Sequence, residues 1–166
     1  FGHQLNVSNE AVFLGAKVCS RLTWKAQIDM LISKAQPRVN LLKALSSLQK
    51  EASPKLIINL YKSIVRPIFE YASIAYINAA PNHIEKLQHL QNCCLRSALK
   101  LPAHISTNIL HDAADVPLLK DHLLSFAKKR LESLKANSDI VCQLIEDSKP
   151  FLLLPHHKSP LEFLGV

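Results

Sequence analysis

The sequence predicts a mainly α-helical protein with a short N-terminal β-hairpin, a multi-helix bundle of about five to six helices and an extended C-terminal arm. From residue 24 to residue 147, most apolar residues recur at helical spacing. The chain has 166 residues, of which 48% are hydrophobic and 3 are glycine, so it can fill a core and is not typical of a disordered segment. We therefore expect three regions: the hairpin at 1–23, the helices at 24–147 and the arm at 148–166.

The first 23 residues keep no helical period and contain two short apolar stretches. Turn-forming residues lie beside these stretches at 8–10 and 20–21, which is typical of two short strands. Gly15 directly follows Phe13 and Leu14, and a glycine at such a place allows the backbone to bulge or to approach a ligand closely. We expect a β-hairpin or a small edge sheet here.

A helical apolar stripe begins after Trp24 and continues to Leu45. Pro37 lies inside this stripe, and proline removes a backbone hydrogen bond from a helix interior. The sequence therefore predicts either one kinked helix or two short ones. Nearer the C-terminus it predicts a short helix at Thr107–Ala114, a long helix that Asp115 opens, and a last short helix from Ser138 to Ile145.

The stretch from Ser53 to Asn78 predicts one long helix, which begins with a Ser-Pro pair and is kinked near Ile64–Arg66 by Pro67. Its apolar residues cover an arc of roughly 220° at about 100° per residue, so we expect it to be packed on several sides. A narrow polar strip remains, which contains Lys55, Asn59, Lys62, Arg66 and Glu70. Three cations in line on an otherwise buried helix predict a track for a polyanion.

The next predicted helix carries a second basic row. Its outward face holds Lys86, His89, Cys93, Arg96 and Lys100. The first hundred residues contain 13 Lys/Arg and 5 Asp/Glu, a formal charge of +8, whereas the rest of the chain contains 7 and 8, a charge of −1. Basic helix faces are commonly just solvated, but two rows in one basic half favour a nucleic-acid surface that follows the phosphate backbone. The aromatic residues available nearby for stacking are Phe13, Trp24, Tyr61 and Tyr76.

Most catalytic motifs are absent from the sequence, which has no glycine-rich phosphate loop, no His-Glu-x-x-His, no Gly-x-Ser-x-Gly and no pair of adjacent aspartates. A free-standing enzyme is therefore not expected. His111, Asp112 and Asp115 could form an acid/base cluster, but a helix N-cap at Asp115 is the better interpretation. His89 and Cys93 stand one turn apart, yet no second pair has metal-ligand spacing, so no metal site is expected.

The four cysteines are Cys19, Cys93, Cys94 and Cys142, and none of them forms a Cys-x-x-Cys pair. Reduced thiols are the simplest interpretation, which favours an intracellular protein of the nucleus or the cytoplasm. No apolar run is long enough for a membrane span, so no membrane partner is expected. The chain opens on Phe-Gly-His without an initiator methionine, and we expect it to be a segment of a longer protein.

Several stretches carry motifs in the order in which one protein family has them. Phe13-Leu14-Gly15 is followed by Arg21-Leu22-Thr23-Trp24-Lys25, and the run 60–71 reads Leu-Tyr-Lys-x-x-Val-x-Pro with an acid-Tyr pair. The run 87–96 reads Leu-Gln-x-x-Gln-Asn-x-x-Leu-Arg, and 110–118 continues it. Over residues 11–135 the chain thus resembles the reverse transcriptases of non-LTR (LINE-like, Jockey-type) retrotransposons, from the end of the palm onward.

The resemblance implies that Phe13, Leu14 and Gly15 belong to the primer grip, the hairpin that holds the primer 3′ end toward the catalytic aspartates. The helices after Trp24 would be the thumb and its extension, which clamp an RNA–DNA template–primer duplex. The catalytic aspartates and their Mg²⁺ ions would lie in a palm upstream of Phe1, with the remainder of the polymerase chain as a partner. This segment would then hold no cofactor itself and would grip without polymerising.

The basic rows and the resemblance together predict a set of nucleic-acid-binding residues. These are Phe13, Leu14, Gly15, Trp24, Lys25, Lys55, Lys62, Arg66, Lys86, Arg96 and Lys100. Two positions depart from the family: Ala72, where relatives tend to have glycine after the acid-Tyr pair, and Pro37, in a helix expected to be continuous. The alternative interpretation is a helical protein-interaction module derived from a retroelement, whose basic rows contact an acidic protein.

Overall fold

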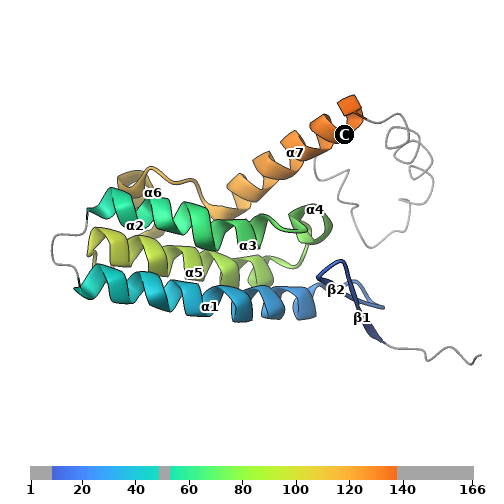
Figure 1. The fold of residues 1–166 in the computed structure, drawn as a ribbon, viewed down its shortest axis with the longest axis horizontal. Helices are drawn as coiled ribbons and strands as arrows, with labels where there is room; N and C mark the ends of the chain where they lie inside the picture. The colour runs from blue at the N-terminus through green and yellow to red at the C-terminus, as the bar shows by residue number, and fades with distance from the viewer. Residues whose placement is uncertain (1–8, 49–52, 138–166) are drawn as a thin grey trace, which may run out of the picture.

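The computed structural model of the chain describes residues 9–48 and 53–137. The mainly α-helical fold with an N-terminal hairpin is confirmed (Figure 1). The elements are β1 (Glu10–Phe13), β2 (Ala16–Cys19), α1 (Lys25–Leu48), α2 (Pro54–Leu60), η1 (Tyr61–Val65), α3 (Arg66–Glu70), α4 (Ser73–Tyr76), α5 (Pro81–Leu99), α6 (Thr107–Ala114) and α7 (Leu119–Asn137). The helix predicted at 138–145 and the arm predicted at 148–166 lie outside the described residues, and the division into three regions stays a prediction.

The bundle is built from three rods that lie side by side: α1, the continuous run α2–η1–α3, and α5 (Figure 1). The most extensive packing is between α1 and α5. The hairpin lies at the end of the bundle where α1 begins, and α2 begins at the opposite end, where α1 and α5 finish. No helix in the described part of the chain is long and apolar enough to cross a bilayer.

The hairpin has two antiparallel strands, in which Glu10 faces Cys19 and Phe13 faces Ala16. Leu14 and Gly15 form the turn, with φ of 47° and 78°. Two positive φ angles in a two-residue turn match the right-handed twist of the strands, and glycine adopts such an angle without steric cost. The glycine that interrupts the apolar stretch therefore marks the turn.

One continuous helix, α1, runs through Pro37, so the predicted alternative of two short helices is wrong. The reason is the unbroken buried stripe on one face, while Pro37 itself is exposed on another. The buried apolar residues of this stripe are Ile28, Leu31, Ala35, Val39 and Leu42. Burial along more than four turns outweighs the loss of one hydrogen bond.

The helix predicted from Ser53 to Asn78 ends early, at Glu70, because the chain turns at Tyr71 and Ala72 before the short helix α4. The kink expected near Ile64–Arg66 takes the form of the π-helical segment η1, in which Arg66 N–H donates to the carbonyl of Tyr61. This segment lies just before Pro67, which cannot donate to the preceding turn. The expected packing on several sides does not reach the ends of the stretch, since Leu56 is 50% and Tyr71 is 51% exposed.

The core is one large cluster that joins α1, the α2–η1–α3 rod, α5, α6 and the first half of α7. Tyr61, Phe69 and Tyr76 are among its largest fully buried side chains. The second half of α7 contributes Ala127 and Leu131 to a separate small cluster. Figure 1 shows this end of α7 extending away from the three rods.

Candidate nucleic-acid interface

The tip of the hairpin presents apolar side chains to solvent. Phe13 is 70% and Leu14 is 77% exposed, and the neighbouring Val12 is also exposed. Large apolar side chains at a turn that nothing in the described chain covers are unusual for a purely structural hairpin. The structure thus places the three predicted residues Phe13, Leu14 and Gly15 together at one projecting point.

Two side chains of the helical part hold the hairpin. The backbone N–H of Lys17 in β2 donates to Oε1 of the buried Gln27 on α1, at 2.6 Å. The hydroxyl of Tyr71 donates to the backbone carbonyl of Leu14 in the turn. Neither Gln27 nor Tyr71 was predicted as a site residue, because no local sequence pattern shows which backbone group a side chain from another element will reach.

Trp24 and Lys25 join the hairpin to α1. Trp24 has a φ of 58° and is half-buried, with its side chain packed against the main core. Lys25 is exposed and lines, together with Lys17 and Cys19, a hollow of about 470 Å³ between the hairpin and the start of α1. Lys25 is therefore the predicted cation that lies beside the hairpin, whereas Trp24 mainly serves the core.

The cations of the first basic row do not form one continuous basic surface. Lys55 is exposed and Lys62 is half-buried, and neither has an ion pair with another described residue. Arg66 instead lies 3.1 Å, from Nε to Oε1, from the carboxylate of Glu70. This Nε–H makes no hydrogen bond of good geometry, so the contact is a charge–charge attraction. The same Glu70 oxygen lies 2.7 Å from Nε2 of His122 on α7.

The π-helical segment η1 also changes the direction of the row. A π-turn contains one residue more than an α-turn, so residues on its two sides are rotated by about 100° relative to a continuous α-helix. Lys55 precedes η1 and Arg66 follows it. The even spacing in the sequence therefore overestimates how well these two cations line up.

In the second basic row, two lysines are exposed to solvent and the arginine bonds to the protein backbone. Lys86 is exposed on α5. Lys100, which directly follows α5 and has a left-handed backbone with a φ of 54°, is also exposed. Arg96 is half-buried and donates from Nη2 to the carbonyl of Ile105, at 3.2 Å, so it holds the loop before α6. Lys55 is in the first turn of α2 and Lys100 directly follows α5, and Figure 1 places the start of α2 and the end of α5 at the end of the bundle opposite the hairpin. The 17 residues from Pro54 to Glu70 span roughly 25 Å between the two ends.

The two tyrosines expected to be available for stacking are buried, so that expectation is wrong. Tyr61 and Tyr76 are both fully buried in the core. Burial raises the pKa of both phenols well above the usual value. Tyr76 donates its hydroxyl to the carbonyl of Phe69, which ties α4 to α3. Both residues are structural.

The three amide side chains of the run 87–96 form a network between α5, α6 and the start of α7, in which Gln91 and Asn92 are buried and Gln88 is half-buried. Gln88 Nε2 contacts Asn92 Oδ1 at 2.8 Å, and its Oε1 accepts from the backbone N–H of Leu119 at 2.7 Å. Gln91 donates to the carbonyl of Pro117 at 3.1 Å. These amides satisfy one another and the backbone. The stretch that carries much of the family resemblance is thus part of the scaffold.

His111 belongs to the same network and not to an acid/base cluster. Its Nδ1 lies 2.8 Å from the carbonyl of Val116, and its Nε2 lies 2.8 Å from Asn92 Oδ1. Asp115 directly follows α6 and is left-handed, with a φ of 50°, and α7 begins only at Leu119, so the predicted N-cap role is wrong. Asp112 is exposed.

His89 and Cys93 do meet, with 3.7 Å between Nε2 and Sγ. No group of three or more potential metal ligands occurs among residues 9–48 and 53–137. Within this part of the chain, nothing extends the pair into a metal centre.

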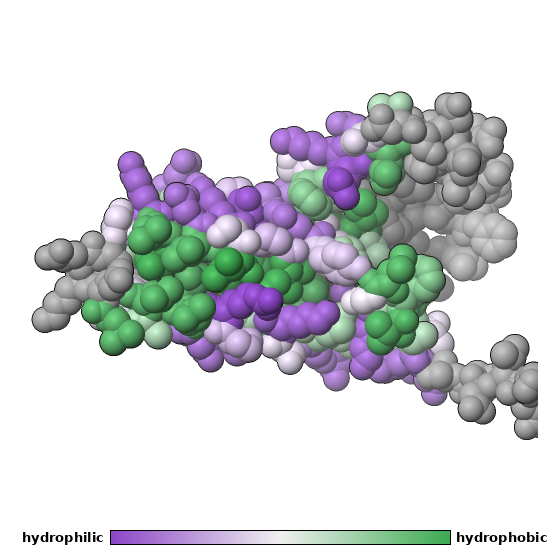
Figure 2. All heavy atoms as spheres, in the orientation of Figure 1, coloured by the Kyte–Doolittle hydropathy of each residue, from purple (hydrophilic) through white to green (hydrophobic). Residues whose placement is uncertain are grey.

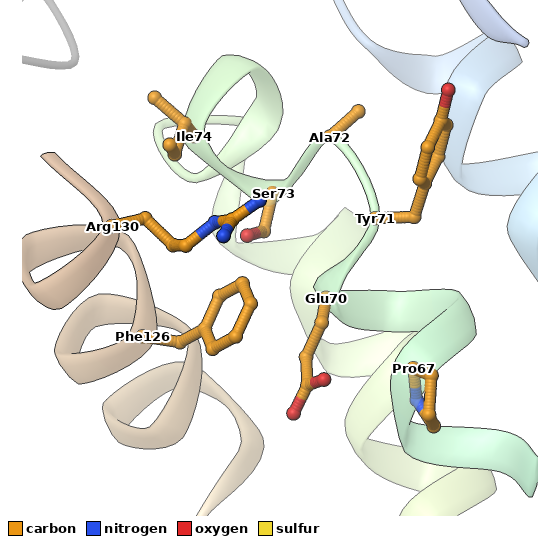
Figure 3. Close-up of a pocket in the computed structure, with 8 residues that line it drawn as sticks. All are labelled: Pro67, Glu70, Tyr71, Ala72, Ser73, Ile74, Phe126 and Arg130. Carbon is orange, nitrogen blue, oxygen red and sulfur yellow. The ribbon is translucent and has the colours of Figure 1, made fainter. Parts of the chain in front are cut away.

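A cavity of about 360 Å³ lies between the α3–α4 turn and α7 (Figure 3). Figure 3 shows Arg130 of α7 pointing toward Ser73, with the ring of Phe126 below them. The hydroxyl of Ser73 is buried without a hydrogen-bond partner in the described chain. None of the predicted nucleic-acid-binding residues lines this cavity, so it is separate from the predicted interface.

The described chain is thus a helical bundle with a basic first half and an attached hairpin whose apolar tip is exposed. In sequence it is similar to the RNA-directed DNA polymerase from mobile element jockey of Drosophila melanogaster, with 28% identity over 125 residues, which are 75% of this chain and 14% of the relative. It is also similar to the polymerase of the same name from Drosophila funebris, with 28% identity over 136 residues, which are 82% of this chain and 15% of the relative.

These matches confirm the resemblance to Jockey-type non-LTR reverse transcriptases that the motifs predict. The chain spans about one seventh of the length of these relatives. No family model matches the chain. No solved structure matches it either.

Proposed function

We propose that the chain is part of an RNA-directed DNA polymerase of a Jockey-type retrotransposon, in which the hairpin and the helices grip an RNA–DNA template–primer duplex. The observation that carries this proposal is the similarity to jockey polymerases over three quarters of the chain. The exposed apolar hairpin tip and the excess of positive charge in the first hundred residues support it.

Each part of the described chain has a role in this proposal. The hairpin tip, with Phe13 and Leu14, contacts the end of the primer, and Lys25 contacts a phosphate beside it. Lys62, Lys86 and the distant Lys55 and Lys100 contact phosphates along the bundle, without reading the base sequence. Arg66 and Arg96 contribute less than the sequence suggests, since Glu70 and the carbonyl of Ile105 already engage them.

The proposal assigns no chemical step to these residues. The sequence contains no pair of adjacent aspartates, and no cluster of three potential metal ligands occurs in the described part of the chain. Phosphoryl transfer and its Mg²⁺ ions therefore belong, in this proposal, to the rest of the polymerase. The chain alone binds duplex and incorporates no nucleotides, and templated primer extension by the chain alone contradicts this assignment.

The dependence of duplex affinity on salt tests the phosphate contacts. Replacing Lys55 or Lys62 by alanine should reduce the slope of log K against log salt by about 0.7 to 0.9 per contact, because each contact releases counterions. Fluorescence anisotropy with an RNA–DNA duplex at several salt concentrations measures this slope. Arg66→Ala should reduce it less, and Lys34→Ala, at an exposed position of α1 outside the proposed surface, should leave it unchanged.

A second candidate function, a helical protein-interaction module, is favoured by exposed leucines at the other end of the bundle. Leu48 of α1 and Leu56 of α2 are both exposed, as is Leu41. Figure 2 shows hydrophobic side chains gathered on one face over this end of the bundle. A chain that binds no duplex at low salt contradicts the first function and leaves this one.

A further inference from the structure

The orientation of the hairpin depends on few contacts. Among the described residues its sheet has only the strands β1 and β2. An isolated two-stranded hairpin is marginally stable in water and gains its stability from packing on other elements. The strand β2 packs on α1, but the side chains at the tip are exposed, so hydrogen bonds nearer the base and turn contribute to the direction of the tip.

Tyr71 makes the connection at the turn. It follows the last residue of α3 and has an extended backbone, with a ψ of 126°, and the next residue, Ala72, is left-handed. This break in the helix sends the Tyr71 side chain away from the rod. Figure 3 shows Tyr71 pointing away from Glu70 and Ser73, toward the ribbon of the N-terminal region.

The hydroxyl of Tyr71 meets a backbone group that the hairpin itself leaves open. The strands pair Phe13 with Ala16, so the carbonyl of Leu14 lies in the turn, beyond the last pair of the ladder. The Tyr71 hydroxyl donates to this carbonyl. A Cβ atom built on Gly15 would lie 3.5 Å from the same hydroxyl oxygen, so the turn and the phenol are in close contact.

We propose that Tyr71 is a positioning residue, whose hydrogen bond to the Leu14 carbonyl fixes the direction in which the apolar tip of the hairpin projects from the bundle. Gln27 on α1 holds the other attachment point, the N–H of Lys17. The Gln27 bond and the packing of β2 hold the base of the hairpin on α1, and the Tyr71 bond holds its turn from a second segment, so the two together define its direction. The consequence for the primer end rests on the proposed function, while the attachment itself does not.

Amide hydrogen exchange tests the attachment without any ligand. In Tyr71→Phe, the amides of the hairpin should exchange about 2- to 10-fold faster, which is the effect expected from the loss of one hydrogen bond. The amides of Ala11, Lys17 and Ser20 are suitable reporters, because a ladder bond to Val18, the Gln27 side chain and the Asn9 carbonyl hold them. Amides in α5 should be unaffected. Unchanged exchange in the hairpin overturns the proposal.

Tyr76→Phe is the matched control. Tyr76 also donates its hydroxyl to a backbone carbonyl, that of Phe69, but this bond lies within the helical part. Its loss should leave the relative exchange of the hairpin unchanged. If Tyr76→Phe releases the hairpin as much as Tyr71→Phe does, general destabilisation explains the result and the positioning role is wrong.

A second arm measures the consequence for the primer end. The affinity of the chain is compared for an RNA–DNA duplex with a recessed primer 3′ end and for a continuous duplex of equal length. Tyr71→Phe should reduce the preference for the recessed end by about 2- to 10-fold and leave the salt slope unchanged. An unchanged preference overturns the positioning role. A wild-type chain that binds neither duplex overturns the proposed function, and the exchange arm then decides on the attachment alone.

Discussion

At the scale of single residues, Ala72 shows how a departure from a family pattern can have a backbone origin. The resemblance predicts an altered contact where relatives tend to have glycine. The structure gives Ala72 a φ of 55°, at the turn between α3 and α4. Left-handed backbone is costly for any residue with a Cβ atom and free of that cost for glycine. Glycine at this position therefore fits the conformation better than alanine does.

Replacing Ala72 by glycine should stabilise the chain. Relief of the left-handed strain should exceed the added entropy of the unfolded chain, which gives a free energy of unfolding higher by about 0.5 to 1 kcal/mol. Chemical denaturation followed by circular dichroism measures this difference. The control is Ala75→Gly, inside α4, which should destabilise the chain by a similar amount. A loss of stability in both variants contradicts the argument.

The cysteines should differ in reactivity because their surroundings differ. Thr23 Oγ1 lies 3.4 Å from Cys19 Sγ, and hydrogen bonds from Thr23 lower the pKa of Cys19. Burial raises the pKa of Cys94 to about 12. The thiolate is the reactive form, so at pH 7.5 iodoacetamide should modify Cys19 well before Cys94.

The hydroxyl of Thr23 can be tested separately. In Thr23→Val the largest cause of the lowered pKa is gone, so the pKa of Cys19 rises and its thiolate fraction at pH 7.5 falls. The alkylation rate, measured site by site with mass spectrometry, should therefore decrease at pH 7.5. It should approach the wild-type rate near pH 10, where the Cys19 thiol is largely ionised in both the wild type and the variant. Equal rates at pH 7.5 contradict this assignment.

Sequence reasoning found the residues whose role is local and missed those whose role depends on a distant partner. The role of Gly15 could be predicted from its place in an apolar stretch, and together with Leu14 it forms the turn of the hairpin. Tyr71 and Leu14 are 57 residues apart, and no spacing rule connects them. Glu70 lies one helical turn after Arg66, so that pair is local, but the contact of Glu70 with His122 required the position of α7.

At the scale of elements, the buried amide network shows that a motif shared with a family can serve the scaffold. Gln91 is 1% exposed, donates to the Pro117 carbonyl and accepts from Gln88. Gln91→Leu should lower the free energy of unfolding by about 1 to 3 kcal/mol, because buried polar partners lose their hydrogen bonds. Thermal and urea denaturation measure this.

The matched control is Gln36→Leu on α1. Gln36 also bonds through its amide, to Asn40 at 2.9 Å, but this pair is at the surface. Its replacement should change the free energy of unfolding by about 0.5 kcal/mol or less. Comparable losses in the two variants would show that burial of the network does not matter.

Helix existence was predictable and helix boundaries were less so. Periodicity located α1, α5, α6 and α7, because each has a buried stripe or a clear start. The π-turn of η1 and the break at Tyr71 leave no signal in the periodicity, since the apolar pattern of the sequence continues without interruption across both. Pro37 was given too much weight, because the packing of α1 on α5 compensates for one missing hydrogen bond.

At the scale of the whole molecule, the core is divided unevenly along α7. Leu119 and Leu123 belong to the main cluster, whereas Ala127 and Leu131 form the small one. Segments with few buried apolar contacts open at lower free energy. Amides from 127 to 137 should therefore exchange roughly tenfold faster than those from 122 to 126, which have helical acceptors, an opening free energy about 1.4 kcal/mol lower. Uniform protection along α7 would contradict this division of the core.

The distribution of charge over the molecule was predicted, but its arrangement was not. The basic half of the sequence forms the hairpin, α1, the α2–η1–α3 rod and α5. Helical spacing suggested two straight rows, whereas the structure uses Arg66 and Arg96 internally and separates Lys55 from the hairpin by the length of the bundle. The net charge of a segment depends on its composition alone, whereas the alignment of its basic side chains depends on how the helices pack.

The small sheet has a further consequence for the behaviour of the chain at high concentration. Each strand pairs on one side with the other strand, and in the described residues no third strand completes the outer sides. Gln27 of α1 already accepts from the Lys17 N–H on the outer side of β2, so the outer side of β1 is the rim whose N–H and C=O groups can recruit strands from other molecules. Lys17 and Glu10, paired at 2.9 Å across the ribbon, place charge there and oppose this recruitment. Without this charge, intermolecular strand pairing would begin at the hairpin.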